Sequence, residues 1–320
     1  MRLLLLIVLW RNNIARKENT VSRTNAVSGK GTIMALAGIN FSNIADQELI
    51  ALFHQVLDRK IHGISFSPYI DGQGPGTDIS EAQILERLRV IQPHIGWVRS
   101  FSCTEGNEAI GRIAHENGLQ SMIGVWLEDD LENNEKELAN AIEVARSGHA
   151  DIIAVGNEVL LRGDLSEDEL IDYINRVKRA VPGIDVGYVD AYFKFVDHPR
   201  VADACDVILA NCYPFWEGCS AEYSLLYMKD MYRRAVQVAK GKKVIISETG
   251  WPDVGTPTGA AVPSYANAIR YFLNTYQWAE EEGIEIFYFS SFDEDWKVDD
   301  EGDVGASWGL WDKSGQLKYA

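Results

Sequence analysis

The sequence predicts a single-domain α/β fold, a closed parallel (β/α)₈ barrel. Eight short strand-like segments alternate with helix-like segments over about 250 residues, the usual length of such a barrel. Hydrophobic residues make up 46% of the 320-residue chain, so a large core can form. An open doubly wound sheet is the competing arrangement, and eight successive units fit it less well.

The chain begins with a segment that predicts no folded element. Met1–Trp10 has a charged start and a short apolar run, which suits a signal peptide and is far too short to span a bilayer. No cleavage site of the usual type lies close to it, and a spurious extension with Met34 as the true start is the alternative. We expect residues 1–33 to be disordered, removed or spurious. A signal peptide predicts a secreted or cell-envelope protein, whereas a start at Met34 predicts a cytoplasmic one.

Residues 34–60 precede the barrel and are expected to supply an accessory helix. Between Asp46 and Lys60, apolar residues that include Leu49, Phe53 and Leu57 recur at helical spacing. Residues 61–320 then form the catalytic barrel. Only about 30 residues follow the eighth strand, so the last outer helix of the barrel should be short or missing. We expect the accessory helix to fill part of that gap.

The eight strands are rich in β-favouring residues, and the segments between them have recognisable helix starts. Ser80 with Gln83, and Ser166 with Glu169, have the spacing of capping boxes. The predicted strands, in order, are Ile61–Phe66, Trp97–Phe101, Ser121–Leu127, Ile152–Asn157, Asp185–Val189, Val207–Cys212, Val244–Ser247 and Ile284–Ser290.

Charge and cysteine content exclude several classes of function. A formal net charge of −17 disfavours nucleic acid as a partner. Cys205 and Cys212 fall at opposite ends of one strand and cannot bridge each other. Cys103 and Cys219 could meet in loops, although free thiols are the better prediction. No cysteine or histidine cluster indicates a metal site, no cofactor is implied, and the chain is expected to be a monomer.

Two strands end on glutamates and carry the functional prediction. The apolar run Asp151–Val155 leads to Gly156-Asn157-Glu158, and Val244–Ser247 leads to Glu248 and Gly250-Trp251-Pro252. In parallel barrels the loops after the strands build the active site. If the two carboxyl groups lie about 5 to 5.5 Å apart, one can attack a sugar's anomeric carbon while the other protonates the leaving oxygen. Each glutamate alone could equally be a partner in a loop salt bridge. Together they predict an enzyme that retains the anomeric configuration.

These segments resemble the two signatures of glycoside hydrolase family 17, whose members act on β-1,3-glucans through a (β/α)₈ barrel. The resemblance runs from about His62 to Asp312 and includes Phe292–Lys297 and Ser307–Trp311. Gly63–Tyr69 and Tyr213–Gly218 are most similar to the bacterial and fungal branch. One departure is Gly305, where the plant branch has another glutamate, so any role of that residue is not carried over.

The resemblance implies roles for individual residues. Glu248 would be the nucleophile and Glu158 the acid/base, in keeping with the different environments that the two roles need. Asn157 would bond the 2-hydroxyl of the sugar, or merely tie down a strand end, and Tyr213 would hold the nucleophile or belong to the core. Glu294 and Lys297 match positions that orient catalytic groups and substrate. An ordinary surface pair is the competing interpretation of these two.

Five tryptophans fall on or just after strands, where their rings could stack on glucose. About half of them should contact sugar, since tryptophan also fills barrels. Trp216, Trp251 and Trp296 are the predicted substrate-binding members, and Trp126 and Trp308 complete the set.

Four functions therefore remain distinct. The first is a retaining enzyme that cleaves β-1,3-glucan internally, and the second is a β-1,3-glucanosyltransferase that uses the same glutamates but passes the sugar to another sugar. Trp216 or Trp296 could provide an acceptor platform for such transfer. A non-catalytic glucan-binding barrel is a more remote alternative, and an aldolase-like barrel with a Schiff base on Lys297 is remoter still.

Overall fold

The structure is a computed structural model that describes residues 38–39, 41 and 44–320. The chain divides into a short unit, Met1–Asn40, and a unit that spans Phe41–Ala320. The predictions for Met1–Trp10, for residues 1–33 and for Met34 lie outside the described residues.

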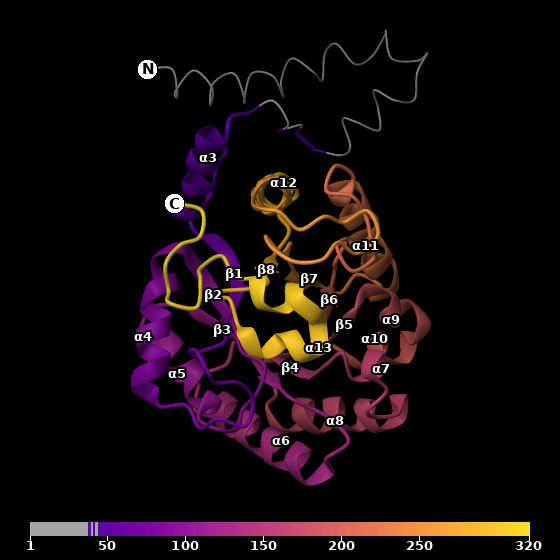
Figure 1. Cartoon of the computed structure of the whole chain (residues 1–320). Coiled ribbons are helices and arrows are strands. Elements are labelled where there is room, and N and C mark those ends of the chain that lie inside the picture. The colour runs from indigo at the N-terminus through magenta and orange to yellow at the C-terminus, as the bar shows by residue number, and fades with distance from the viewer. Residues whose placement is uncertain (1–37, 40, 42–43) are drawn as a thin grey trace. The chain divides into compact units, whose positions relative to one another are not determined.

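Eight parallel strands form a closed barrel, as the sequence predicted (Figure 1). Each strand pairs with the next, and β1 closes the barrel by pairing with β8 through Gly63 and Phe287. A side chain at Gly63 would collide with the Phe287 ring, 2.6 Å from an ideal Cβ, so the closing strand requires glycine there. The strands are β1 (Ile61–Ser65), β2 (Ile95–Arg99), β3 (Gln120–Val125), β4 (Ile152–Asn157), β5 (Asp185–Ala191), β6 (Val207–Asn211), β7 (Val244–Thr249) and β8 (Ile286–Tyr288).

The barrel interior is a packed core of branched and aromatic side chains. Met122, Ile152, Leu209, Ile245 and Phe287 are among its fully or almost fully buried members. Such filling is usual for barrels of eight strands, and it forces functional groups to the ends of the strands.

The outer helices cover the barrel and begin where the capping residues predicted. Ser166 and Glu169 form a complete capping box, whereas the Ser80 side chain accepts a bond from Gln83 without that box being closed. The helices are α3 (Asp46–Asp58), α4 (Glu81–Ile91), α5 (Ile110–Glu116), α6 (Leu131–Arg146), α7 (Val159–Arg162), α8 (Glu167–Ala180), α9 (Tyr192–Asp197), α10 (Pro199–Ala204), α11 (Ser224–Ala239), α12 (Tyr265–Glu282) and α13 (Val298–Glu301), with 3₁₀ turns η1 (Gln92–His94), η2 (Asn107–Ala109), η3 (Asp295–Lys297) and η4 (Gly302–Ser307).

The accessory helix fills the gap that follows the eighth strand. After β8 the chain forms only η3, α13 and η4, so no full outer helix covers this side. Helix α3 packs there instead. Its buried Phe53 ring lies 4.6 Å from Phe272 of α12 and 4.9 Å from Tyr319 near the C-terminus, centroid to centroid. This part of the sequence prediction is confirmed.

Most strand ends differ from the predicted ones, and none differs by more than two residues. Strand β2 begins at Ile95, two residues earlier than predicted, because η1 ends directly before it. Strand β8 keeps only Ile286–Tyr288 of the predicted Ile284–Ser290. The strand register shifts near the carboxyl ends of β4, β6 and β7. Such irregularities are common beside active sites because they change the direction of a side chain.

Candidate active site

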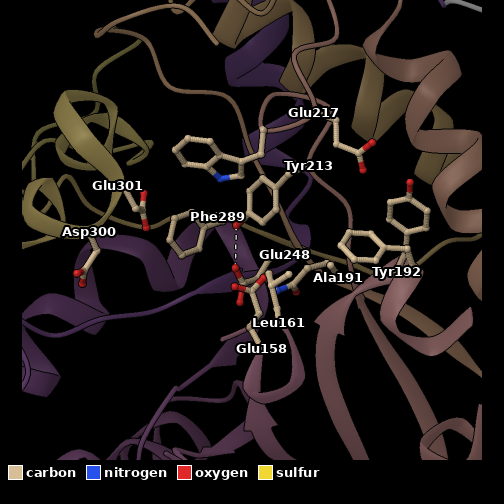
Figure 2. A pocket seen from close by; sticks show the side chains of 13 residues that line it. Glu158, Leu161, Ala191, Tyr192, Tyr213, Glu217, Glu248, Phe289, Asp300 and Glu301 are labelled. Carbon is tan, nitrogen blue, oxygen red and sulfur yellow. Dashed lines mark hydrogen bonds between the residues drawn. The ribbon is translucent and has the colours of Figure 1, made fainter. Parts of the chain in front are cut away.

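A pocket of about 530 Å³ opens at the carboxyl ends of β4 to β7. Figure 2 shows its side chains, with Glu158 and Glu248 close together at one end and α13 contributing the opposite wall from Tyr192. Its carboxylates are Glu158, Glu217, Glu248, Asp300 and Glu301, and its aromatic side chains are Tyr192, Phe193, Tyr213, Trp216 and Phe289. The structure therefore brings both predicted glutamates into one pocket.

Glu248 is held on both carboxyl oxygens. It lies at the end of β7, is 5% exposed, and accepts a bond from the Arg99 guanidinium at 2.6 Å on Oε1. The Tyr213 hydroxyl donates to Oε2 at 2.8 Å, drawn as a dashed line in Figure 2. Bonds from a cation and a hydroxyl are the environment that an ionised carboxylate needs, and they fix its orientation.

Arg99 is the functional residue that the sequence analysis missed most clearly. It is buried at the end of β2, and its second terminal nitrogen donates to Asn157 Oδ1 at 2.7 Å. One guanidinium therefore joins Glu248 to Asn157. An arginine within the apolar segment Trp97–Phe101 was the available signal, because a buried charge needs a partner.

Glu158 has a different environment. Burial, reinforced by the negative charge of Glu248, raises its pKa to about 7, and a bond from Asn211 acts in the opposite direction. The Asn211 amide donates to Glu158 Oε1 at 2.8 Å and is itself held by the Ser247 hydroxyl at 2.9 Å. Asn211 was also missed, although an asparagine at the end of a predicted strand marks it. Near neutral pH, Glu158 can thus hold or release a proton.

The backbone at Glu158 is in the left-handed region, with φ of 53°. This conformation is uncommon for a residue with a side chain, and the surrounding structure must hold it. The Glu158 amide donates to the Val189 carbonyl of β5 at 2.8 Å.

The predicted tryptophans lie in three different places. Trp216 lines the pocket and is 39% exposed, so its face is open to a ligand. Trp296 lines a second cavity of about 450 Å³ between the loops after β1 and β8. Trp251 does not fit its predicted role, because it is 1% exposed and packs on Phe215 and Tyr271. Its ring supports the wall behind the site.

Glu294 and Lys297 form a buried ion pair rather than a surface one. Their charged atoms lie 2.5 Å apart, and the residues are 5% and 7% exposed. Glu294 lines the second cavity. The Lys297 amine lies 4.2 Å from the centre of the Phe289 ring, and Phe289 lines the main pocket. The pair lies beside the pocket without lining it.

Glu301 enters the pocket from α13 and was not predicted. Burial raises its pKa to about 7, while Lys297 and the Trp308 indole act against that increase. It extends toward the pocket from the wall that also carries Asp300 (Figure 2).

The residues that the structure describes carry neither a metal-binding cluster nor a membrane-spanning helix. These residues include no group of three or more His, Cys, Asp or Glu side chains that could hold a metal ion. They also include no helix with the length and apolar character needed to cross a membrane. All four cysteines are free.

A parallel barrel that presents two glutamates of contrasting environment in one aromatic-lined pocket defines a class of protein, the two-carboxylate glycosidases. Comparison with known proteins identifies the family within that class. Residues 63–309 match the BtgE/BtgC glycoside hydrolase domain. The glucan 1,3-beta-glucosidase BGL2 of Candida albicans is 31% identical over 259 residues, which cover 73% of this chain and 84% of the relative. The glucan 1,3-beta-glucosidase of Saccharomyces cerevisiae is 28% identical over 270 residues, which cover 77% and 86%.

Solved structures support the same family. The glycoside hydrolase family 17 β-1,3-glucanosyltransferase from Rhizomucor miehei aligns with a TM-score of 0.73 and 27% identity, covering 82% of this chain and 96% of that one. An endo-laminarinase from Formosa aligns with a TM-score of 0.69 at 17% identity and supports the fold alone. The chain belongs to the BtgE/BtgC glycoside hydrolase domain family and, as the sequence motifs implied, to glycoside hydrolase family 17.

Proposed function

We propose that this chain is a retaining enzyme that cleaves β-1,3-glucan, with Glu248 as nucleophile and Glu158 as acid/base. The substrate is supported by relatives named as glucan 1,3-beta-glucosidases and by a Rhizomucor miehei relative, 26% identical, whose active-site mutant was solved with laminaritriose. One observation carries the mechanism: both glutamates face one pocket, where Glu248 accepts bonds from Arg99 and Tyr213, while burial and the charge of Glu248 raise the pKa of Glu158.

The first step forms a covalent glycosyl-enzyme. A Glu248 oxygen attacks the anomeric carbon while the bond from that carbon to the bridging oxygen breaks, and the Glu158 proton passes to the leaving oxygen. Arg99 and Tyr213 orient the attacking carboxylate. We assign Asn157 to the 2-hydroxyl of the reacting sugar, because its amide oxygen is already bonded to Arg99 and its NH₂ group can face the ligand.

The second step releases the sugar. Glu158, now ionised, takes a proton from the incoming hydroxyl, whose oxygen bonds to the anomeric carbon as Glu248 leaves. Two inversions at the same carbon retain the β configuration. The separation of about 5 to 5.5 Å between the carboxyl groups stays a prediction of this mechanism.

Transfer to a second sugar is the alternative fate of the intermediate. The pocket offers aromatic faces on Tyr192, Phe193 and Trp216, on which an acceptor glucose could stack. The Rhizomucor miehei relative is named as a glucanosyltransferase. Water gives a glucanase, whereas a sugar held on these rings gives a transferase.

A time course with one defined β-1,3-gluco-oligosaccharide tests the proposal. Shorter products alone would establish hydrolysis, and products longer than the substrate would establish transfer. Glu248→Ala should lower the rate by several powers of ten, since losing a nucleophile usually costs that much. Glu280→Ala is the control, because Glu280 pairs with Arg59 on the exposed surface. A Glu248→Ala rate within about tenfold of wild type would exclude Glu248 as nucleophile. Glucan binding without any turnover by the wild type would establish a binding barrel instead.

The oligomeric state is part of the same proposal. The described barrel closes its own sheet, with β1 paired to β8, and requires no strand from a second chain. We therefore expect a monomer, and light scattering during gel filtration tests this.

A further inference from the structure

Two buried residues of β5, Tyr188 and Asp190, lie behind the pocket and do not line it. Both are essentially inaccessible to solvent, at 1% and 0% exposure. The Tyr188 hydroxyl donates to Asp190 Oδ2, and the Ala191 amide donates to Asp190 Oδ1 at 2.7 Å. Burying a carboxyl group and a phenol is costly unless both are hydrogen-bonded, and these bonds offset that cost.

The pair reaches the backbone directly beyond Glu158. The Leu160 amide donates to the Tyr188 hydroxyl at 2.9 Å, so one phenol links α7 to Asp190. Strand β5 thus holds this turn at two points, since Val189 accepts the Glu158 amide at 2.8 Å. Glu158 is itself one of these points, and its positive φ must be imposed by its surroundings.

We propose that Tyr188 and Asp190 are a positioning pair that fixes the turn carrying Glu158 and thereby aims its carboxyl group into the pocket. This inference rests on the proposed role of Glu158 as acid/base. Neither residue touches substrate; both act through the position of the Glu158 backbone.

The charge of Asp190 adds an electrostatic effect. Glu158 is influenced by the carboxylates of Glu248 and Asp190, which raise its pKa, and by Arg162, which lowers it. Burial raises the pKa of Asp190 to about 6, against the Tyr188 bond, the Ala191 and Leu161 amides and the charge of Lys194. Around neutral pH Asp190 is therefore largely ionised and helps Glu158 to keep its proton.

The first experiment separates acid catalysis from general damage. Tyr188→Phe keeps the ring and removes the oxygen that holds Leu160. We expect kcat/KM on a β-1,3-gluco-oligosaccharide to fall about 10- to 100-fold, a part of what general acid catalysis contributes. On 2,4-dinitrophenyl β-laminaribioside, whose leaving group needs no proton, the fall should stay below about threefold. Equal losses on both substrates would overturn the proposal. Tyr276→Phe is the matched control, because Tyr276 is also buried and its hydroxyl has no hydrogen-bond partner.

The second experiment needs no turnover. In Asp190→Asn the negative neighbour is gone, so the midpoint of the Glu158 carboxyl titration, followed by ¹³C NMR and assigned with Glu158→Gln, should move to lower pH. The high-pH limit of kcat/KM should move in the same direction. An unchanged titration would overturn the electrostatic part of the proposal. If the wild type cleaved no β-1,3-glucan, the proposed function would fail while the titration still tested the pair.

Discussion

Arg99 determines how Glu248 and Asn157 face the same sugar. Its two terminal nitrogens donate to the two residues at 2.6 and 2.7 Å. Lysine keeps the charge but has no planar fork, so it cannot hold both partners. We expect Arg99→Lys to lower kcat about 10²- to 10³-fold, as the loss of one preorganised donor does in other enzymes.

Arg87→Lys is the matched control for that substitution. Arg87 is also buried, lies over the Phe292 ring and donates to the Lys313 carbonyl, away from the pocket. Its activity should stay within about threefold of wild type. Equal losses from the two substitutions would mean that Arg99 acts only through stability.

The pKa of Glu158 predicts the pH dependence of glucan cleavage. A general acid works only in its protonated form, and Glu158 loses its proton as the pH rises through about 7. We therefore expect kcat/KM to fall above about pH 7, while Glu158→Gln lacks that high-pH limit. Initial rates between pH 5.5 and 9 measure it. Constant activity up to pH 9 would contradict the assignment of Glu158 as acid.

Sequence reasoning found the residues whose role depends on the local strand and missed those whose role depends on a distant partner. Glu158 and Glu248 each end an apolar run, so their position could be predicted. The bond from Arg99 to Glu248 joins residues 149 positions apart, and only the closed barrel brings them together. The burial of Trp251 likewise results from packing against Phe215 and Tyr271, which no spacing in the sequence indicates.

At the scale of elements, the short segment after β8 changes the pocket most. Helix α13 lies in this segment and brings Glu301 to the pocket wall. A carboxyl group in a glucan site can accept bonds from sugar hydroxyls, and bonds to charged groups contribute about 1.5–3 kcal/mol. We expect Glu301→Gln to raise KM for a β-1,3-gluco-oligosaccharide about tenfold with a smaller change in kcat.

Asp299→Asn on the same helix is the control for Glu301→Gln. Asp299 is exposed and does not line the pocket, so its loss should leave KM within about twofold. If both substitutions raised KM equally, the effect would come from the general charge of α13.

Element boundaries show the limits of local patterns. Strand β4 matches its predicted bounds because an apolar run sits between polar residues, whereas β8 is shorter than its apolar run. From Ser290 onward, backbone bonds run to the C-terminal segment after η4, for example from the Leu310 amide to the Ser290 carbonyl at 3.0 Å. Apolar composition cannot distinguish such pairing from a barrel strand.

At the scale of the whole described barrel, the fold could be predicted because strand and helix periods alternate along the chain. Closure by Gly63 against Phe287 and the packing of α3 on α12 are consequences of that order. The burial of carboxyl groups, which raises their pKa values, could not be predicted from that alternation. Burial raises the pKa of Glu137, and it raises the pKa values of four other carboxyl groups to about 7 for Glu158 and Glu301 and about 6 for Asp190 and Asp293.

These four groups predict that the protein is more stable at pH 6 than at pH 8. Each binds its proton more tightly folded than unfolded, so its contribution is full below the unfolded pKa, near 4, and is lost as the pH rises through 6 to 7. His62 opposes this, because burial lowers its pKa from 6.5 to about 4, so its contribution to stability rises as the unfolded histidine loses its proton between about pH 6 and 7; it is one group against four. A thermal scan should show a Tm several degrees lower at pH 8, since about 1 kcal/mol corresponds to about 2–4 °C in a large domain.

Glu158→Gln should raise the Tm more at pH 8 than at pH 6, because glutamine removes a charge that exists mainly at the higher pH. A Tm that rose from pH 6 to pH 8 would mean that these carboxyl groups reach water in the folded protein.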